Sequence, residues 1–189
     1  TGELLMKPKV LITAPCYEDR CTEGLRILEA YGCELIINRR GRLLTFEEQK
    51  EIVGDIDAVI AGSDLWDARI FPYAKKLKYI SRFGVGIDTL NLDDIRQFGI
   101  RANYSPGINS NAVSEQAIGL LLSLLRNIPP LHRSTKQGGW VRYVTHEIKG
   151  QTVGLVGFGA VARLVAEKLI PFGAKLLAYD LAPNRSEAE

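Results

Sequence analysis

The chain has 189 residues, of which 46% are hydrophobic and 24% are charged, and its formal net charge is +2. This composition is ordinary for a globular protein of one or two domains, and the small net charge gives no reason to expect a nucleic-acid partner. The longest apolar stretch, Ala117 to Leu125, is too short to cross a bilayer, so we expect no membrane partner either. Cys16, Cys21 and Cys33 lack metal-ligand spacing, which predicts no metal site and free thiols in a reducing cytoplasm.

Short apolar runs alternate with helix-like segments through the first part of the chain. This alternation predicts an α/β fold, a flavodoxin-like, doubly wound parallel sheet with helices on both faces. The predicted strands span residues 9–13, 33–37, 58–61, 78–83 and 100–104, and the predicted helices span residues 18–31 and 45–54. The second helix starts with a capping box, Thr45 to Glu48. Such sheets bind ligands at the loops that follow the strands' carboxyl ends, which here are residues 14–17, 62–64, 84–88 and 105–109.

The tripeptide Ser105-Pro106-Gly107 interrupts the alternation and is the predicted domain boundary. It separates a first domain, residues 6–104, from a second domain, residues 105–189. The second domain begins with a predicted helix over residues 111–127, and because apolar residues occur nearly all round it, we expect it to be buried on most sides. Pro129-Pro130 is expected to end this helix, and a polar segment then leads to the next strand.

The run from Gly157 to Ala162, Gly-Phe-Gly-Ala-Val-Ala, is the most informative part of the chain. It follows a predicted strand at residues 152–156 and opens a predicted helix at residues 160–169, and a second predicted strand, residues 175–179, runs into Asp180. Asp180 follows the first glycine at about the 20-residue spacing expected of the acid in a dinucleotide-binding unit. The whole pattern predicts the beginning of a Rossmann domain, and a glycine-rich turn without a ligand is the alternative.

Each residue type in this run suits the binding of a dinucleotide. Gly157 permits the tight turn, Gly159 lets the backbone approach a pyrophosphate, and Ala162 lets the helix pack on the strand. The helix N-terminus offers unpaired N–H groups and a partial positive charge to the phosphates. Asp180 would accept hydrogen bonds from the ribose hydroxyls and repel a 2′-phosphate, which favours NAD over NADP, although Arg185 would weaken that repulsion.

The second domain as it stands holds only two predicted strands and one helix between them. A two-stranded parallel unit cannot cover its own faces or edges, and a complete dinucleotide-binding domain has about six strands. We therefore expect the chain to be a fragment, or the ordered part of a longer protein, with residues 105–189 forming an incomplete Rossmann domain.

Three segments, in this order and spacing, are together typical of one family: residues 81–92, residues 103–126 and residues 149–180. Through them the chain resembles the D-isomer-specific 2-hydroxyacid dehydrogenases, and most closely their D-3-phosphoglycerate dehydrogenase branch. The resemblance implies an NAD-dependent enzyme that interconverts a D-2-hydroxy acid and its 2-oxo acid in a cleft between a substrate domain and a cofactor domain. It also implies a homodimer that pairs through the helix and arm at residues 109–145.

The resemblance assigns substrate-binding roles around the end of the fourth predicted strand. Gly84-Val85-Gly86 matches the family loop whose backbone N–H groups hold the substrate carboxylate, as an anion nest would. Val85 also matches a position near the nicotinamide end of the cofactor. Arg82 matches a basic residue that faces the cleft and pairs with a carboxylate or phosphate, and an ordinary strand-edge arginine is the alternative. Asn109 faces the cleft in the family, and a plain helix N-cap is the alternative.

In the cofactor domain the resemblance covers the glycine run and the acid. Gly157, Gly159 and the backbone of Ala160 and Val161 match positions that meet the pyrophosphate, and Asp180 matches the ribose-binding acid. Many relatives carry an arginine where this chain has Ala160. One charge next to the phosphates is therefore absent, and we expect a lower affinity for the cofactor.

The family's catalytic histidine, carboxylate and arginine lie well beyond Asp180, so no catalytic residue is assigned in this chain. His132 and His146 lie outside the family's catalytic motifs, and we expect the 189-residue chain alone to show no turnover. The alternatives are an NAD-regulated binding protein of the same family, similar to corepressors, and a nucleotide-binding module such as a methyltransferase. The expected substrate, 3-phosphoglycerate, needs a cationic pocket that Arg82 alone does not provide, so hydroxypyruvate, glyoxylate and D-lactate stay open.

Overall fold

The computed structural model describes residues 7–182. The chain divides into two compact units, with the boundary between Pro106 and Gly107, and each unit is described by itself. Among the described residues, none of the helices combines the length and the apolar character that a membrane span requires.

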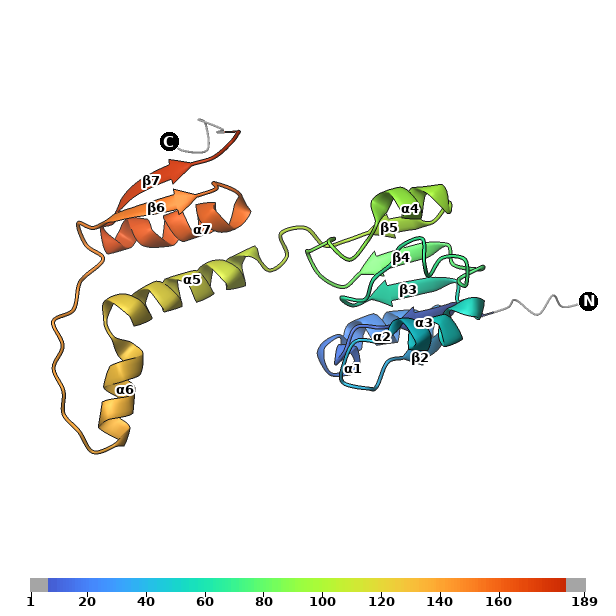
Figure 1. Ribbon diagram of the computed structural model, residues 1–189, viewed down its shortest axis with the longest axis horizontal. Helices are drawn as coiled ribbons and strands as arrows, with labels where there is room; N and C mark the ends of the chain where they lie inside the picture. The colour runs from blue at the N-terminus through green and yellow to red at the C-terminus, as the bar shows by residue number, and fades with distance from the viewer. Residues whose placement is uncertain (1–6, 183–189) are drawn as a thin grey trace, which may run out of the picture. The chain divides into compact units, whose positions relative to one another are not determined.

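The first unit is built on one parallel sheet of five short strands (Figure 1). The strands are β1 (Lys9–Ile12), β2 (Glu34–Ile37), β3 (Ala58–Ala61), β4 (Tyr79–Arg82) and β5 (Arg101–Asn103). Their order in the sheet is β2-β1-β3-β4-β5, and every neighbouring pair is parallel. This is the flavodoxin-like order of a doubly wound sheet, so the predicted fold class is confirmed.

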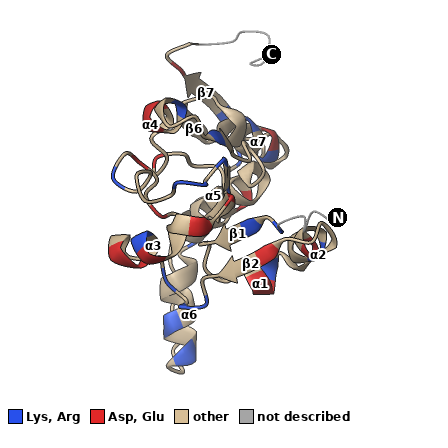
Figure 2. Ribbon diagram, turned by 90° about the vertical axis from the view of Figure 1, so that its right-hand side faces the viewer, with Lys and Arg blue, Asp and Glu red and all other residues tan. Residues whose placement is uncertain are grey.

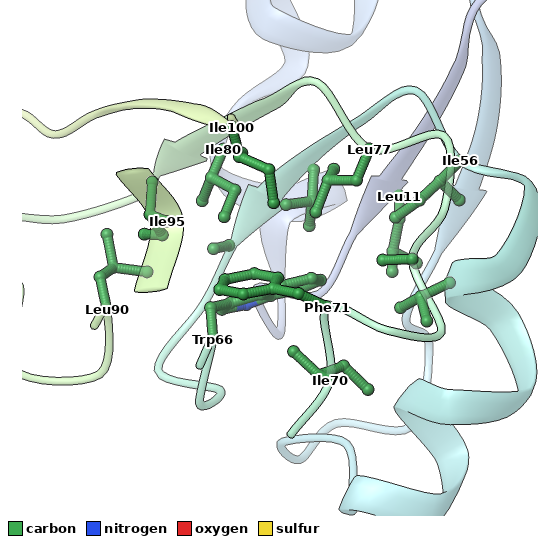
Figure 3. Close-up of a cluster of buried hydrophobic side chains, with 14 residues drawn as sticks. Leu11, Ile56, Trp66, Ile70, Phe71, Leu77, Ile80, Leu90, Ile95 and Ile100 are labelled. Atoms are coloured by element: carbon green, nitrogen blue, oxygen red, sulfur yellow. The ribbon is translucent and has the colours of Figure 1, made fainter. Parts of the chain in front are cut away.

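Helices and loops cover both faces of this sheet because successive residues of each strand point to opposite sides. On one face, Val10 and Ile12 pack with Tyr17 and Leu25 from the helices α1 (Tyr17–Arg20) and α2 (Thr22–Ala30). The other face carries the larger core, which α3 (Phe46–Ile52), α4 (Leu92–Gln97) and the segment between β3 and β4 enclose. Figure 3 shows this core, in which aliphatic side chains surround the fully buried Trp66.

Local sequence signals explain most of these elements and two departures from expectation. The capping box is present, since the Thr45 hydroxyl accepts from the Glu48 amide and the Glu48 carboxylate accepts from the Thr45 amide. The predicted helix at residues 18–31 is instead two helices, because the backbone leaves the helical region at Cys21, with φ −133° and ψ 52°. Helix α4 was not predicted, although the Asn91 side chain caps it by accepting hydrogen bonds from the amides of Asp93 and Asp94.

The second unit contains the predicted βαβ element. Strands β6 (Thr152–Val156) and β7 (Lys175–Tyr179) pair in parallel, and α7 (Ala160–Leu169) connects them. These bounds agree with the predicted ranges, as does the two-stranded extent of the sheet. Helix α5 (Ser110–Leu125) packs against α7 (Figure 1), and Ile118, Val165 and Leu169 form the centre of this core.

One expectation for the second unit was wrong, and one helix was not predicted. Helix α5 is buried along one face only, and Val113, Leu120 and Leu124 are exposed, because within this chain α7 covers a single side of the helix. As expected, α5 ends before Pro129-Pro130, and residues 137–151, which hold no helix or strand, lead to β6. A further helix, α6 (Ile128–Lys136), was not predicted, and both prolines lie in its first turn. A proline fits there because the first amides of a helix need no intrahelical partner. Blue segments of the α6 ribbon in Figure 2 mark its basic residues, of which Arg133 and Lys136 lie in the last turn.

Candidate functional site

The glycine turn between β6 and α7 presents a row of free backbone amides. Gly157 has φ +86°, a conformation that favours glycine, and its N–H donates to the Tyr179 carbonyl at 2.7 Å. Gly159 is the N-cap of α7 and no side chain caps the helix. Within residues 7–182, the N–H groups from Gly159 to Ala162 donate to no acceptor. Four consecutive donors at a helix N-terminus are suited to an anionic group such as a phosphate.

The space in front of these amides is open in the second unit. A Cβ atom added to Gly159 would meet no described atom within 4 Å, and the same holds at Gly157. A ligand can therefore approach the backbone of the turn closely. The amides and the open space together fit the pyrophosphate of a dinucleotide, the group for which the sequence singled out Gly157, Gly159, Ala160 and Val161.

Asp180 lies directly after β7 and is hydrogen-bonded to the glycine turn. Its Oδ2 atom accepts from the Phe158 amide at 2.7 Å, and its Oδ1 atom accepts from the Ala182 amide at 2.9 Å. The hydrogen bond from Phe158 is the main cause that lowers the pKa of the Asp180 carboxyl, and the bond from Ala182 adds to it. An ionised carboxylate has about four acceptor positions, so Asp180 keeps acceptor capacity for ribose hydroxyls. Arg185, which was expected to weaken the preference for NAD, lies outside the described residues.

The lowered pKa of Asp180 leads to a pH prediction. Because the folded-state pKa lies below the ordinary value of about 3.9, the bond to Phe158 is fully present above that value and is lost only as the pH falls through the folded-state pKa. We expect the Phe158 amide resonance of the chain to titrate with a midpoint below about 3.9, the ordinary aspartate value. A pH series of amide NMR spectra measures this midpoint. The Asp180→Asn variant should lose the titration, and a midpoint at or above the ordinary value would contradict the prediction.

In the first unit, the loops after β1, β3 and β4 lie at the carboxyl edge of the sheet. Strand β1 continues to β2 on one side of the sheet, and β3 continues to β4 and β5 on the other. The gap between β1 and β3 is therefore the topological switch point, where doubly wound sheets bind ligands. Thr13 joins the two loops there, since its Oγ1 atom accepts from the Gly62 amide at 2.8 Å. A Cβ at Gly62 would lie 2.9 Å from the Ala14 Cα, so only glycine permits this approach.

The turn after β4 presents a second row of free amides. Gly84 has φ +149°, and its own N–H is turned inward, donating to the Arg82 carbonyl at 2.9 Å. The next amides, those of Val85, Gly86 and Ile87, donate to no acceptor among residues 7–182. Consecutive unpaired N–H groups of this kind form a nest for an anion. The geometry therefore favours Val85, Gly86 and Ile87 as the carboxylate-binding amides and gives Gly84 the task of shaping the turn.

The other substrate-binding candidates differ in what the structure assigns to them. The Arg82 guanidinium is hydrogen-bonded to the surrounding backbone and to Ser63. Asn109 is the N-cap of α5 through its backbone, but its side chain makes no capping hydrogen bond, so the plain N-cap alternative does not explain its side chain. Asn109 belongs to the second unit, whereas Arg82 and the nest belong to the first.

Two features of this edge were not predicted. Ile87 contributes a free amide, and nothing in its side chain signals this. Asp64 is almost completely buried next to Gly62; its Oδ1 atom accepts from the Leu44 amide at 3.1 Å, and its Oδ2 atom has no partner among the described residues. The one sequence signal for Asp64 is that it is an acid in the loop directly after β3.

A catalytic pair is absent from the described part of the chain. His132 and His146 are the only histidines, and neither makes a hydrogen bond or ion pair with a carboxylate within residues 7–182. The same residues contain no group of three or more histidine, cysteine, aspartate or glutamate side chains that could hold a metal ion.

The glycine turn, the helix N-terminus and the acid after β7, following a doubly wound α/β unit, define a dinucleotide-binding protein of two α/β domains. Residues 118–189 match the family described as D-isomer specific 2-hydroxyacid dehydrogenase, NAD binding domain. The chain belongs to the D-isomer-specific 2-hydroxyacid dehydrogenase family.

Relatives of this chain carry several different names within the family. D-3-phosphoglycerate dehydrogenase of Methanocaldococcus jannaschii is 33% identical over 175 residues, which is 91% of this chain and 32% of that protein. Hydroxypyruvate reductase of Thermotoga maritima is 32% identical over 168 residues, 85% of this chain and 55% of that protein. The NAD⁺-bound crystal structure of 3-phosphoglycerate dehydrogenase from Entamoeba histolytica matches with a TM-score of 0.75 and 28% identity, over 94% of this chain and 55% of that one. The chain thus spans between about a third and about half of the length of these proteins.

Proposed function

We propose that this chain supplies the substrate-binding domain and part of the NAD-binding domain of an NAD-dependent dehydrogenase that oxidises 3-phosphoglycerate. The observation that carries the proposal is the pair of free-amide rows, one in each unit. The row at the start of α7, together with Asp180, suits the pyrophosphate and ribose of NAD. The row from Val85 to Ile87 suits the carboxylate that every 2-hydroxy acid carries.

The residues of this chain act in the reaction by binding and orientation. NAD⁺, when bound, accepts the hydrogen on C2 of the substrate as a hydride, which converts the hydroxy acid to the 2-oxo acid while the hydroxyl loses its proton. The Val85–Ile87 nest fixes the carboxylate and thereby the position of C2 beside it. Val85 also matches a family position near the nicotinamide, which supports a role for this one turn in orienting both reacting groups. With alanine and not arginine at position 160, the pyrophosphate would be held by the backbone amides from Gly159 to Ala162 without a charged side chain from that position.

The proton acceptor is proposed to lie outside these 189 residues, because neither histidine of the chain is paired with a carboxylate among the described residues. The chain alone is therefore expected to bind NAD without turnover. The exposed apolar residues Val113, Leu120 and Leu124 support a homodimer formed through the helix and arm at residues 109–145. A cytoplasmic location is part of the same proposal.

The choice of 3-phosphoglycerate is supported by the relatives named D-3-phosphoglycerate dehydrogenase, among them those of Methanocaldococcus jannaschii and Archaeoglobus fulgidus. The name hydroxypyruvate reductase of the Thermotoga maritima relative makes hydroxypyruvate the main competitor. Both substrates carry a 2-hydroxy or 2-oxo carboxylate, so the Val85–Ile87 nest would bind either of them. Only 3-phosphoglycerate carries a phosphate, so a binding site for that phosphate would distinguish the two.

The test is a comparison of the 189-residue chain with a longer version of the same protein that reaches the full length of its relatives. NADH formation is followed at 340 nm with 3-phosphoglycerate or D-lactate, and NADH consumption with hydroxypyruvate or glyoxylate. We expect turnover of 3-phosphoglycerate by the longer protein and none by the shorter chain. Turnover of hydroxypyruvate alone would overturn the substrate, and NADH binding without any turnover in the longer protein would instead favour the NAD-regulated binding protein. Turnover by the 189-residue chain would overturn the proposed absence of the proton acceptor.

A further inference from the structure

We propose that Arg82 is a positioning residue, which holds the Val85–Ile87 nest in its anion-binding shape, and that it does not itself bind the substrate. This inference rests on the proposed function, since it concerns the site that would hold the substrate carboxylate. It differs from the expectation drawn from the sequence, in which the guanidinium of Arg82 pairs with a carboxylate or phosphate.

The first observation is that the donors of Arg82 are already committed. Its Nε–H donates to the Gly86 carbonyl at 3.0 Å, and Nη1 donates to the carbonyls of Phe83 at 2.6 Å and Ala61 at 3.3 Å. Nη2 donates to the Ser63 hydroxyl at 3.3 Å. A guanidinium has five N–H donors, so four of them are used within the first unit. A substrate that took over these donors would have to break bonds that hold the loop.

The second observation is that the guanidinium lies close to the turn at Gly84. A Cβ atom at Gly84 would lie 3.1 Å from Nη1, 3.3 Å from Cζ and 3.4 Å from Nη2 of Arg82. A side chain at position 84 would therefore press against the guanidinium, and the turn comes this close to Arg82 because the residue there is glycine. The φ of +149° at Gly84 adds a second reason for glycine at this position.

The bond to the Gly86 carbonyl determines where the free amide of Ile87 points. In a planar trans peptide the C=O and the following N–H point in opposite directions. Because the Gly86 carbonyl faces Arg82, the N–H of Ile87 is directed away from the guanidinium. Arg82 also bridges two strands, since Ala61 ends β3 and Arg82 ends its neighbour β4. One side chain thus orients the Ile87 amide and ties the turn to the loop that contains Ser63.

Substitution of Arg82 by lysine separates the effect of the side chain's shape from the effect of its charge. A lysine keeps the positive charge but has a single ammonium group, which cannot reach acceptors spread around a planar fork. If Arg82 positions the nest, Arg82→Lys must lose affinity for the anion as much as Arg82→Met does. If Arg82 pairs with the anion, Arg82→Lys must retain much of the affinity. Arg101→Met is the matched control, because Arg101 lies on the adjacent strand β5 and contacts the ring of Tyr79 instead of the nest.

The experiment is an amide and arginine NMR titration of the complete 189-residue chain with 3-phosphoglycerate, and separately with inorganic phosphate. In the unchanged chain we expect 3-phosphoglycerate to shift the amide signals of Val85, Gly86 and Ile87, while the Arg82 Nε–H signal stays in place. Arg82→Lys and Arg82→Met should each weaken this binding by about tenfold or more, the loss of one hydrogen bond to a charged group. Arg101→Met should leave it unchanged.

Two results would overturn the inference: a shift of the Arg82 Nε–H signal on addition of either ligand, or an Arg82→Lys variant that binds 3-phosphoglycerate as well as the unchanged chain does. If 3-phosphoglycerate shifts none of the three amides in the unchanged chain, the proposed carboxylate site fails, and this failure is separate from that of the positioning role. The ligand-free spectra still test Arg82 in that case. Hydrogen exchange must become faster in Arg82→Lys at the two bonded amides of the turn, those of Gly84 and Ser105, which donate to the carbonyls of Arg82 and Gly84, and unchanged rates would contradict the inference.

Discussion

A valine in place of Gly159 is expected to reduce NADH binding by this chain by about 100-fold or more, since two hydrogen bonds to a charged group are worth about 3 kcal/mol or more. The reason is access, because the valine side chain would occupy the open space through which a pyrophosphate reaches the amides of Ala160 and Val161. The fold itself should tolerate the change. Gly159 has φ −79° and ψ −169°, which any residue adopts, and we expect the free energy of unfolding to fall by about 1 kcal/mol or less through the poorer N-cap.

The measurement pairs an NADH fluorescence titration with thermal unfolding of the same samples. Gly154→Val is the matched control, because a Cβ at Gly154 also meets no atom within 4 Å, but the residue lies inside strand β6 and away from the amide row. It should bind NADH as the unchanged chain does. Equal binding by Gly159→Val and the unchanged chain would show that the pyrophosphate is held elsewhere.

The second large effect concerns self-association. We expect Leu120→Asp to convert the chain from a dimer to a monomer at micromolar concentration. Leu120 is 61% exposed and Leu124 is 74% exposed on the side of α5 that α7 leaves uncovered, and with Val113 they follow one face of the helix. An unpaired carboxylate buried among these residues in an interface would cost several kcal/mol, which is more than a 100-fold loss of dimer affinity.

Sedimentation velocity over a range of protein concentrations measures the dimer fraction. Leu92→Asp is the control, because Leu92 is a half-exposed leucine in the first turn of α4, in the first unit, where an added acid also suits the helix. It should leave the dimer intact. A chain that sediments as a monomer before any substitution, or a Leu120→Asp variant that still dimerises, would remove α5 from the proposed interface.

The sequence predicted the elements whose signals are local. The bounds of β6, α7 and β7 follow from runs of apolar residues punctuated by Gly157 and Gly173, both of which have a positive φ that glycine permits. The alternation of strands and helices predicted the doubly wound sheet of the first unit. The capping box at Thr45 was predicted for the same reason, because both partners lie within one helical turn.

What the sequence could not predict depends on contacts between distant segments. The burial of α5 depends on how many elements pack against it. Its apolar residues predicted burial on most sides, whereas α7 packs against one side only. The donors of Arg82 reach Ala61 and Ser63 only because β3 and β4 pair in one register. The inward turn of the Gly84 amide, which moves the nest by one residue, is likewise a product of the folded loop.

The hydrogen bond between Asp180 and the Phe158 amide has a consequence for any attempt to change the cofactor. Replacement of the acid after β7 by a small neutral residue is a direct way to admit the 2′-phosphate of NADP, because it removes a negative charge. In this chain the same carboxylate also fixes the turn that faces the pyrophosphate, at 2.7 Å from the middle of the Gly-Phe-Gly sequence. A switch of cofactor preference at this position therefore needs a compensating acceptor for Phe158, and a variant that lacks one should lose affinity for both dinucleotides.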